Sequence, residues 1–301
     1  VEQSMVTRVT RGHATRYRLL EPTRQFVNRE IDDQPLQIVT ERHAQYFCDH
    51  VDSIAGDLWT DAETVTADTL TAEWADISRA IAWARRENQF DLAMRPLVAL
   101  GPHMLFQQRH EALEWLADVL EESDGTLSPE LMPSAMRLWS LRAFIEADQP
   151  LARTRLETAE KAYGTSVLSG LITCLVEIIG NDFERLAAES NALWETALAD
   201  GDEAWIGIAA AYRLIGQALL DLSAPSVEGL VEEVNKYIRG PVESTVSCWG
   251  PLSLLTLAVR QGNGEQGRTL HAELARATAE CRAPWFAQIG GGLIAQSQGG
   301  N

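Results

Sequence analysis

From about residue 68 onward, the chain consists of helical blocks separated by short polar breaks, and this rhythm restricts the possible folds more than any other feature. Within the blocks, Leu, Ala and Trp recur at three- and four-residue steps, as in HEALEWLADVLEE (110–122), a spacing typical of amphipathic helices. The alternate breaks fall at Gln107, Asp148, Asn181, Ser223 and Asn263, which are 41, 33, 42 and 40 residues apart. This period is the length of two helices with their turns, so each unit is interpreted as a helix pair.

A single helix pair cannot bury its apolar face alone, whereas stacked pairs cover one another. We therefore predict an all-α fold over residues 68–301: a tetratricopeptide-like (TPR-like) α–α superhelix, which is a solenoid of antiparallel helix pairs. Residues 21–67 contain two further helical segments and are expected to be linker helices. Before them, β-prone runs on either side of Gly12 predict a short β-hairpin within residues 1–20.

Composition restricts the partners of the chain, which carries 43 acidic and 25 basic side chains and a formal net charge of -18. Because non-specific affinity for nucleic acid comes mainly from Lys and Arg at phosphates, we expect no direct nucleic-acid binding. The longest apolar stretch, 168–180, is too short for a membrane span and carries Glu177, so no membrane association is predicted. The four cysteines, which form no Cys-x-x-Cys pair, are interpreted as reduced core residues of a cytoplasmic protein rather than zinc ligands or a disulfide framework.

Two segments are similar to ligand-binding motifs without meeting their requirements. GNGEQGRT (262–269) satisfies G-x-G-x-x-G and nearly satisfies the P-loop pattern, but Arg268 stands where the phosphate-binding lysine belongs. NDFERLAAE (181–189) resembles the magnesium motif of helical terpene synthases, with Arg185 in place of the hydroxyl ligand. We interpret Asp182 instead as the N-terminal cap of a helix. An all-α, magnesium-dependent enzyme of terpene-synthase type is the alternative function.

Candidate binding residues follow from the helix pairs, because in TPR-like arrays the first helix of each pair faces the concave side. Mixed aromatic and cationic side chains there would suit a peptide or an anionic ligand. The predicted concave binding residues are Trp139, Arg142, Tyr212, Arg213, Trp249 and Arg260. Side chains in the seams between packed helices would show the same pattern, so this alternative stays open. His43 and His50, like His103 and His110, are seven residues apart and are interpreted as packing or surface histidines.

The N-terminal part of the chain resembles a known family. RYRLLEPTRQFVNREI (16–31), ERHAQYF (41–47) and LTAEWADISRAIAWARREN (70–88) resemble the segment that joins the winged-helix domain to the helical repeats in bacterial STAND-type signalling ATPases. That group includes large LuxR-type regulators and proteins associated with adenylate-cyclase domains. Thr23 replaces the usual aliphatic residue, and FQQRHEALEWLADVLE (106–121) lacks the glycines of the family's first repeat.

The resemblance implies a role for the opening segment and for the whole chain. Residues 1–20 would be the closing wing of a winged-helix domain, and a hinge would follow, with Tyr17, Arg18, Glu21, Arg24 and Phe26 as its residues. Its arginines would face the upstream nucleotide-binding domain of the same chain, unless they pair locally with Glu21. The sequence starts at Val1 in mid-pattern, and we expect a piece of a longer protein.

The expected function is accordingly a regulatory or sensor module of a multidomain signal-transduction ATPase, of the transcription-regulator kind. The module itself would not be an enzyme, although the parent protein could be an ATPase or a cyclase fusion. Its partner would be a protein or small-molecule effector, and no metal ligand, cofactor or catalytic residue is predicted in the chain.

Overall fold

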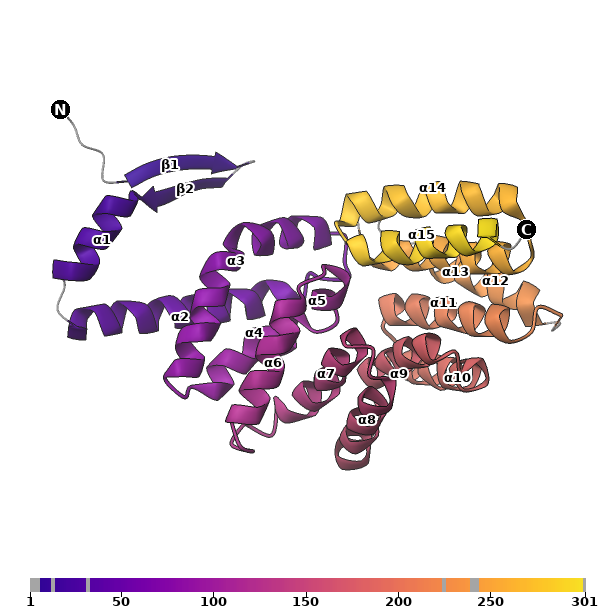
Figure 1. The fold of residues 1–301 in the computed structure, drawn as a ribbon, viewed down its shortest axis with the longest axis horizontal. Helices are drawn as coiled ribbons and strands as arrows, with labels where there is room; N and C mark the ends of the chain where they lie inside the picture. The colour runs from indigo at the N-terminus through magenta and orange to yellow at the C-terminus, as the bar shows by residue number, and fades with distance from the viewer. Residues whose placement is uncertain (1–5, 12–13, 31–32, 224–225, 239–243, 300–301) are drawn as a thin grey trace.

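The computed structural model describes residues 6–11, 14–30, 33–223, 226–238 and 244–299, and these ranges form fifteen helices and two strands. The strands β1 (Val6–Arg11) and β2 (Ala14–Leu19) pair in antiparallel fashion. The helices are α1 (Glu21–Glu30), α2 (Asp33–Ala55), α3 (Glu63–Arg86), α4 (Phe90–Leu100), α5 (His103–Phe106), α6 (His110–Glu122), α7 (Met132–Ile145), α8 (Gln149–Tyr163), α9 (Val167–Gly180), α10 (Phe183–Asp200), α11 (Glu203–Leu220), α12 (Ser226–Tyr237), α13 (Val246–Arg260), α14 (Gly264–Cys281) and α15 (Pro284–Gly299). The described chain is therefore predominantly helical, as the periodicity predicts (Figure 1).

One turn structure recurs between paired helices. Each such turn contains a residue with left-handed backbone conformation, and these residues are Asn88, Gln108, Ala147, Asn181 and Gly262. The residue that follows has φ between -83° and -89° and ψ between 58° and 80°, and it precedes the next helix. Its N–H reaches back to the preceding helix, as from Asp148 to the Ala143 carbonyl at 2.9 Å, a bond that satisfies an otherwise unpaired helix-end carbonyl.

Four of the five breaks expected from the sequence coincide with these turns. Asp148 and Asn263 lie at the starts of α8 and α14, and their side chains accept hydrogen bonds from first-turn N–H groups. Asn181 ends α9, and Gln107 ends α5. Ser223 lies between α11 and α12, where the chain leaves α11 through an extended residue, Asp221, instead of the recurring turn.

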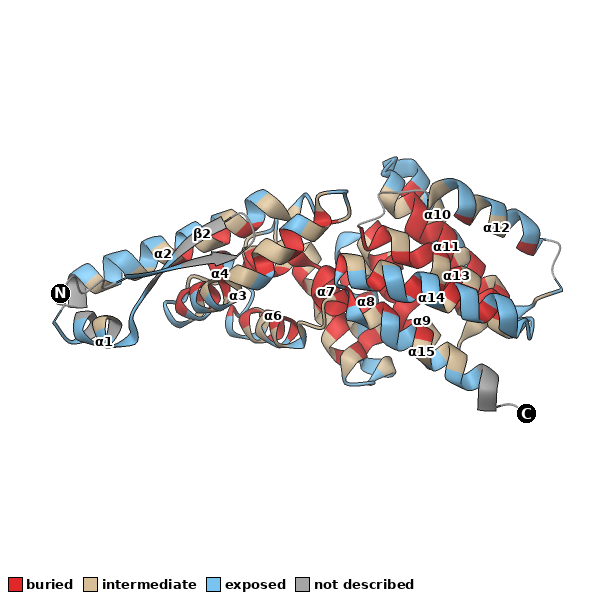
Figure 2. Ribbon diagram, turned by 90° about the horizontal axis from the view of Figure 1, so that it is seen from above, coloured by how far each residue is buried: buried red, intermediate tan, exposed pale blue. Residues whose placement is uncertain are grey.

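Most consecutive helices from α2 onward pack against one another, and their main buried core runs from Ala44 on α2 to Phe286 on α15. Figure 2 shows this buried layer along the facing sides of the helices, with exposed residues outside. Helix α12 covers α11 through a separate apolar cluster that includes Val227, Leu230 and Val234. Small side chains such as Ala209 and Ala211 in the middle of α11 are fully buried and allow its neighbours to approach closely.

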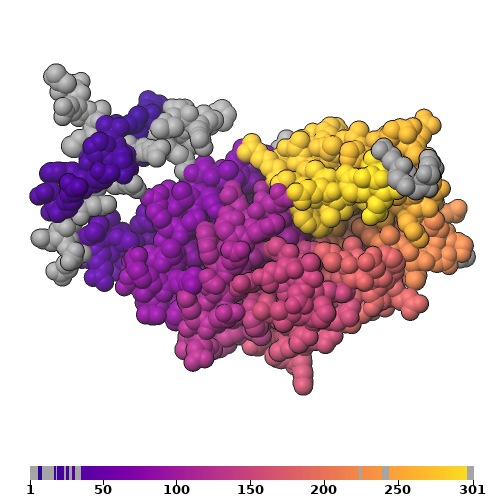
Figure 3. All heavy atoms as spheres, viewed as in Figure 1, coloured from indigo at the N-terminus to yellow at the C-terminus, as the bar shows by residue number. Residues whose placement is uncertain are grey.

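The array curves until its first and last helices touch. Helix α3 contacts α14, and α5 contacts α15. The purple helices and the yellow C-terminal helices accordingly lie side by side in Figure 1 and meet at the surface in Figure 3. Gln107 donates a hydrogen bond to the carbonyl of Cys281 at 3.3 Å, across 174 residues of sequence. A repeat period carries no information on curvature, so the sequence did not predict this contact.

The N-terminal segment lies at the edge of this body. Tyr17 on β2 is 74% exposed and Phe26 on α1 is 63% exposed, while Glu21 accepts a hydrogen bond from Gln25. The side chains of Arg18 and Arg24 lie outside the described residues, so their predicted contacts stay predictions. Within the described ranges, no helix combines the length and the apolarity that crossing a bilayer requires.

Candidate functional site

A cavity of about 420 Å³ opens on the inner side of the curved array. Its walls come mainly from α5, α7, α9, α11 and α13, which are the first helices of successive pairs, and from the last helix, α15. The first residues of α6 and α10, His110 and Phe183, also line it. Figure 3 shows the surface hollowed between the yellow α15 and the pink helices α9 and α11. A volume of this size lies within the range of small-molecule pockets, about 300 to 1,000 Å³.

The residues that line the cavity follow a helical spacing on each wall. On α11 they are Tyr212, Ile215 and Leu219, and on α13 they are Trp249, Leu252 and Thr256, in both cases three and then four residues apart. This spacing places them on one face of each helix. The same face of successive first helices therefore forms a continuous inner wall.

The wall is mostly apolar in its depth and polar at its rim. Tyr212, Trp249 and Leu252 are buried at the base, and burial raises the pKa of the Tyr212 phenol so that it stays neutral. The rim carries the polar side chains Gln108, His110, Asn181, Gln288 and Gln296. Among the described residues around the cavity, none is Asp, Glu, Lys or Arg. In a chain with a net charge of -18, the lining of the cavity contains none of the acidic side chains that produce this charge.

An aromatic cluster extends from the base of the cavity into the body. Trp249 and Trp285 line the cavity, and both contact Phe106 on α5, with ring centroids 5.8 and 5.3 Å apart. Phe106 also contacts Trp59, at 5.9 Å, in the turn before α3. The aromatic cluster therefore connects the cavity with the place where the first and last helices meet.

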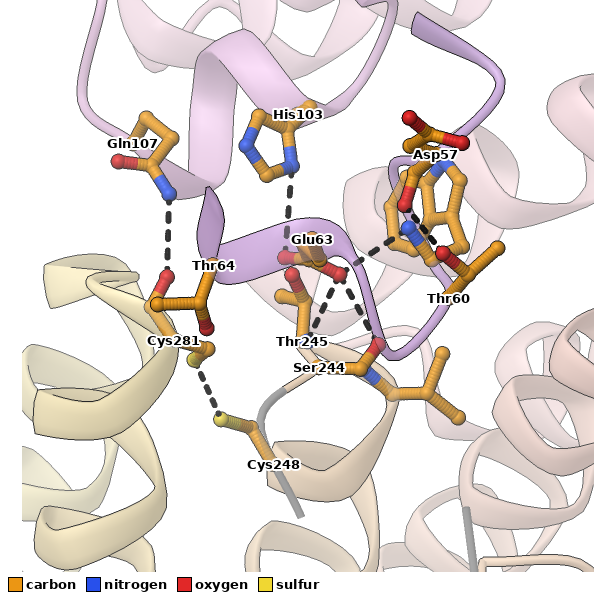
Figure 4. Close-up of polar contacts among 12 residues, drawn as sticks. Asp57, Thr60, Glu63, Thr64, His103, Gln107, Ser244, Thr245, Cys248 and Cys281 are labelled. Carbon is orange, nitrogen blue, oxygen red and sulfur yellow. Dashed lines mark hydrogen bonds and ion pairs between the residues drawn. The ribbon is translucent and has the colours of Figure 1, made fainter. Parts of the chain in front are cut away.

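That meeting place is built around one buried carboxylate, which we call the Glu63 junction (Figure 4). The Oε2 atom of Glu63 accepts hydrogen bonds from the N–H of Trp59 at 3.1 Å, the hydroxyl of Ser244 at 2.9 Å and the N–H of Thr245 at 3.0 Å. Its Oε1 atom lies 3.7 Å from His103 Nδ1. Two donors thus come from a segment about 180 residues away, which ties the start of α13 to α3.

Burial sets the protonation preferences of the junction. Glu63 is fully buried, and desolvation raises the pKa of its carboxyl group above the ordinary 4.5, against the opposing effect of its three donors. Desolvation lowers the pKa of His103 to about 4, so its imidazole is neutral at pH 7. The two neighbours therefore do not form a stable charge pair at neutral pH.

Two of the four cysteines are neighbours at the same place. The sulfur atoms of Cys248 on α13 and Cys281 on α14 are 3.3 Å apart, although 33 residues separate them in sequence. The thiol contact and burial raise the pKa of Cys248. All four cysteines are buried and free, which agrees with the expectation of reduced core residues. The packing of α13 against α14 brings this pair together.

The structure places two of the six predicted binding residues at the cavity, namely Tyr212 and Trp249. Trp139 is covered by the guanidinium of Arg155, which lies 3.9 Å from its ring centroid. Arg260 donates hydrogen bonds to carbonyl groups at the end of α11.

The two remaining predicted cations are engaged in ion pairs. Arg142 forms ion pairs with Glu146 and Asp118. Arg213 lies over Trp194 at 4.9 Å from its ring centroid and pairs with Glu233 on α12. These cations belong to seams between helices, the alternative that the sequence left open. Sequence reasoning missed the apolar wall because it searched for aromatic and cationic side chains, whereas the signal is the run of uncharged residues on the first helices.

The two motif-like segments form turns between helices. Asn181 caps the end of α9, and Asp182 caps the start of α10 by accepting a hydrogen bond from the Arg185 N–H at 3.2 Å. These positions therefore do not project from one helical face, as the terpene-synthase motif requires. Gly262 and Asn263 connect two helices, whereas a P-loop follows a strand. Among the described residues, no group of three or more His, Cys, Asp or Glu side chains has an arrangement suited to a metal ion.

The predicted histidine pairs separate into different environments. His43 and His50 on α2 lie 3.4 and 2.9 Å from the acidic groups of Asp76 and Glu73 on α3, as expected of packing histidines. His103 is buried at the junction, and His110 is exposed at the cavity rim.

Comparison with known proteins gives no relative from which a function could be transferred. No family model matches the chain, and neither the curated proteins nor the solved structures gave a match. The cavity and the Glu63 junction are therefore judged by their own geometry and chemistry.

Proposed function

We propose that the chain is a non-catalytic, ligand-binding module of TPR-like architecture whose effector binds in the inner cavity. The observation that carries the proposal is the mostly apolar cavity of about 420 Å³, formed largely by one face of the successive first helices and lined, among the described residues, by no Asp, Glu, Lys or Arg. Two of its apolar residues remain unusually exposed, Ile179 at 47% and Ile289 at 40%. A bound ligand would remove this apolar surface from water, which is the main source of affinity in such sites.

We further propose that binding serves regulation, in a bacterial STAND-type signalling ATPase of the transcription-regulator kind, in the cytoplasm. The resemblance of residues 16–31, 41–47 and 70–88 supports this assignment. A regulatory ligand must bind two arrangements of the protein with different affinity. The structure has the first and last helices in contact, and the aromatic cluster joins this contact to the cavity. We propose that the second arrangement is one in which this contact is open. The exposed segment with Tyr17 and Phe26 would pass the change to the upstream domain.

A neutral fluorescent probe tests the cavity. N-phenyl-1-naphthylamine should bind the wild type in a saturable manner with an increase in its emission. Ile179→Trp places a large side chain at the cavity rim and should weaken binding at least about tenfold. Leu198→Trp on α10 is the matched control, because Leu198 is 45% exposed and does not line the cavity. Equal probe affinity in both variants, or no probe binding to the wild type, would refute the proposed site.

The enzymatic alternative has its own test. A terpene-synthase-type site would make magnesium and diphosphate together raise the melting temperature, and Asp182→Ala would abolish the rise. For a binding module, we expect no rise from this combination in either protein. Asp182→Ala should then lower the melting temperature through the lost cap and the lost ion pair with Arg153.

A further inference from the structure

The wall formed by α15 differs from the other walls of the cavity because it contains a run of consecutive glycines. It presents Trp285, Gln288, Ile289 and Leu293 to the cavity, and between these residues it contains three consecutive glycines, 290–292. Glycine in a helix interior is about 1 kcal/mol less favourable than alanine, because its unfolded backbone has more freedom. Helix α15 therefore has a low intrinsic stability for a segment that borders a binding site.

Packing explains only one of the three glycines. A Cβ atom at Gly290 would lie 2.6 Å from Cδ2 of Leu274, which is fully buried on α14, so glycine is needed for close approach of the two helices. A Cβ atom at Gly291 or Gly292 would meet nothing within 4 Å. These two glycines lower the stability of the helix without improving its contacts.

The lining of the cavity also limits the chemistry of its ligand. A charged ligand would leave water for a wall that, among the described residues, offers no Asp, Glu, Lys or Arg as a counter-charge and one histidine, His110, which lies exposed at the rim. Burying an unpaired charge in this way is strongly unfavourable. The amide side chains of Gln108, Asn181, Gln288 and Gln296 at the rim can both donate and accept hydrogen bonds, which suits uncharged polar groups at one side of an apolar molecule.

We propose that the cavity takes an uncharged, largely apolar small molecule, and that this ligand orders α15, which acts as the responsive wall of the site. The proposal rests on the proposed function, since it assigns the ligand class and the moving element of the same cavity. Ordering a helix during binding lowers the affinity by the free energy that ordering requires. Substitutions that order α15 in advance should therefore raise the affinity.

The ligand class is tested with two probes that share one ring system. N-phenyl-1-naphthylamine is neutral, and 8-anilino-1-naphthalenesulfonate adds one negative charge. We expect the neutral probe to bind at least about tenfold more tightly, also at 1 M salt, where the Debye length is about 3 Å and the net charge of the protein is screened. Equal or tighter binding of the sulfonate at 1 M salt, with the same loss in Ile179→Trp, would overturn the ligand class.

The role of α15 is tested with paired alanine substitutions. In Gly291→Ala/Gly292→Ala, the affinity for the neutral probe should rise by up to about thirtyfold, the limit set by about 1 kcal/mol of helix propensity for each of the two glycines. Gly229→Ala on α12 is the matched control, because its Cβ would also meet nothing within 4 Å and it does not line the cavity. This control should leave probe affinity unchanged.

Hydrogen exchange provides the direct readout. Amides of residues 284–299 should exchange more slowly when the neutral probe is bound to the wild type, and this protection should already be present in the free double alanine variant. Unchanged exchange in 284–299, together with unchanged affinity of the variant, would overturn the ordering of α15. In that outcome the Ile179→Trp effect would still support the cavity as a binding site, whereas absence of probe binding to every protein would remove both proposals.

Discussion

Glu63 offers the sharpest test of the closed arrangement, because all three of its hydrogen bonds end on one oxygen atom. Glu63→Ala would leave the N–H of Trp59, the hydroxyl of Ser244 and the N–H of Thr245 without their acceptor. The donors of Ser244 and Thr245 are buried, and that of Trp59 is partly buried. An unsatisfied buried donor costs about 1 to 3 kcal/mol. Water that enters the vacated space can accept some of these hydrogen bonds and so reduce the total cost. We therefore expect Glu63→Ala to lower the free energy of unfolding by about 3 to 5 kcal/mol.

Glu63→Gln separates the hydrogen bonds from the charge. The amide oxygen of Gln can take the place of Oε2 and keep the three donors, while its NH₂ group faces His103 in place of Oε1. We expect this variant to lose less than about 1 kcal/mol at pH 7, measured by urea unfolding followed by circular dichroism. If Glu63→Gln were as destabilising as Glu63→Ala, the three donors would not be the source of the stability.

The pH dependence gives an independent check of the same carboxyl group. Because burial raises its pKa in the folded state, the stability that it contributes is fully present below the ordinary value of 4.5 and is lost as the pH rises through the raised pKa. The wild type should therefore lose unfolding free energy relative to Glu63→Gln over that interval. His103, with its pKa lowered to about 4, acts in the opposite sense between 6.5 and 4 in both proteins. A constant difference between the two proteins from pH 4 to 8 would contradict a raised pKa for Glu63.

Two further perturbations test the turns and the thiols. Ala147 has φ of 59°, a left-handed conformation that a side chain disfavours by about 1 to 2 kcal/mol. Ala147→Gly should therefore raise the free energy of unfolding, measured by urea titration, by about 1 kcal/mol. Destabilisation by this substitution would contradict the assigned turn. All four cysteines are buried, and burial raises the pKa of Cys48 to about 12. The cysteines should therefore resist 5,5′-dithiobis(2-nitrobenzoic acid) in the folded protein and react with it when urea unfolds the protein. Rapid reaction of the native protein would contradict this burial.

The sequence predicted the helices and their breaks because both depend on local chemistry. Polar residues at Asp148, Asp182 and Asn263 cap helices, and these residues are recognisable in a single sequence. The glycine or asparagine before them, at Gly262 and Asn181, provides the left-handed residue of the turn. Ala147 in the same role shows the limit of this reasoning, since nothing in its side chain indicates that conformation.

The candidate site was harder to predict because it depends on how helices far apart in the sequence meet. Tyr212 and Trp249 were identified from their place on first helices, and both line the cavity. Arg142 and Arg213 were selected for their charge, but each is engaged by acidic side chains of neighbouring helices. A cation near many acids is as well suited to an ion pair as to a ligand, and the sequence alone does not choose between these roles.

Closure of the array and formation of the cavity have a common structural cause. Helix α15 packs on α13 and α14, forms one wall of the cavity and contacts α5 through the aromatic cluster. Glu63 holds the start of α13 against α3 from the other side of the same cluster. An open array would separate α15 from α5 and leave the cavity without one of its walls, while the donors around Glu63 would return to water. Ligand binding and closure would then favour each other, because each requires α15 to be in the same place.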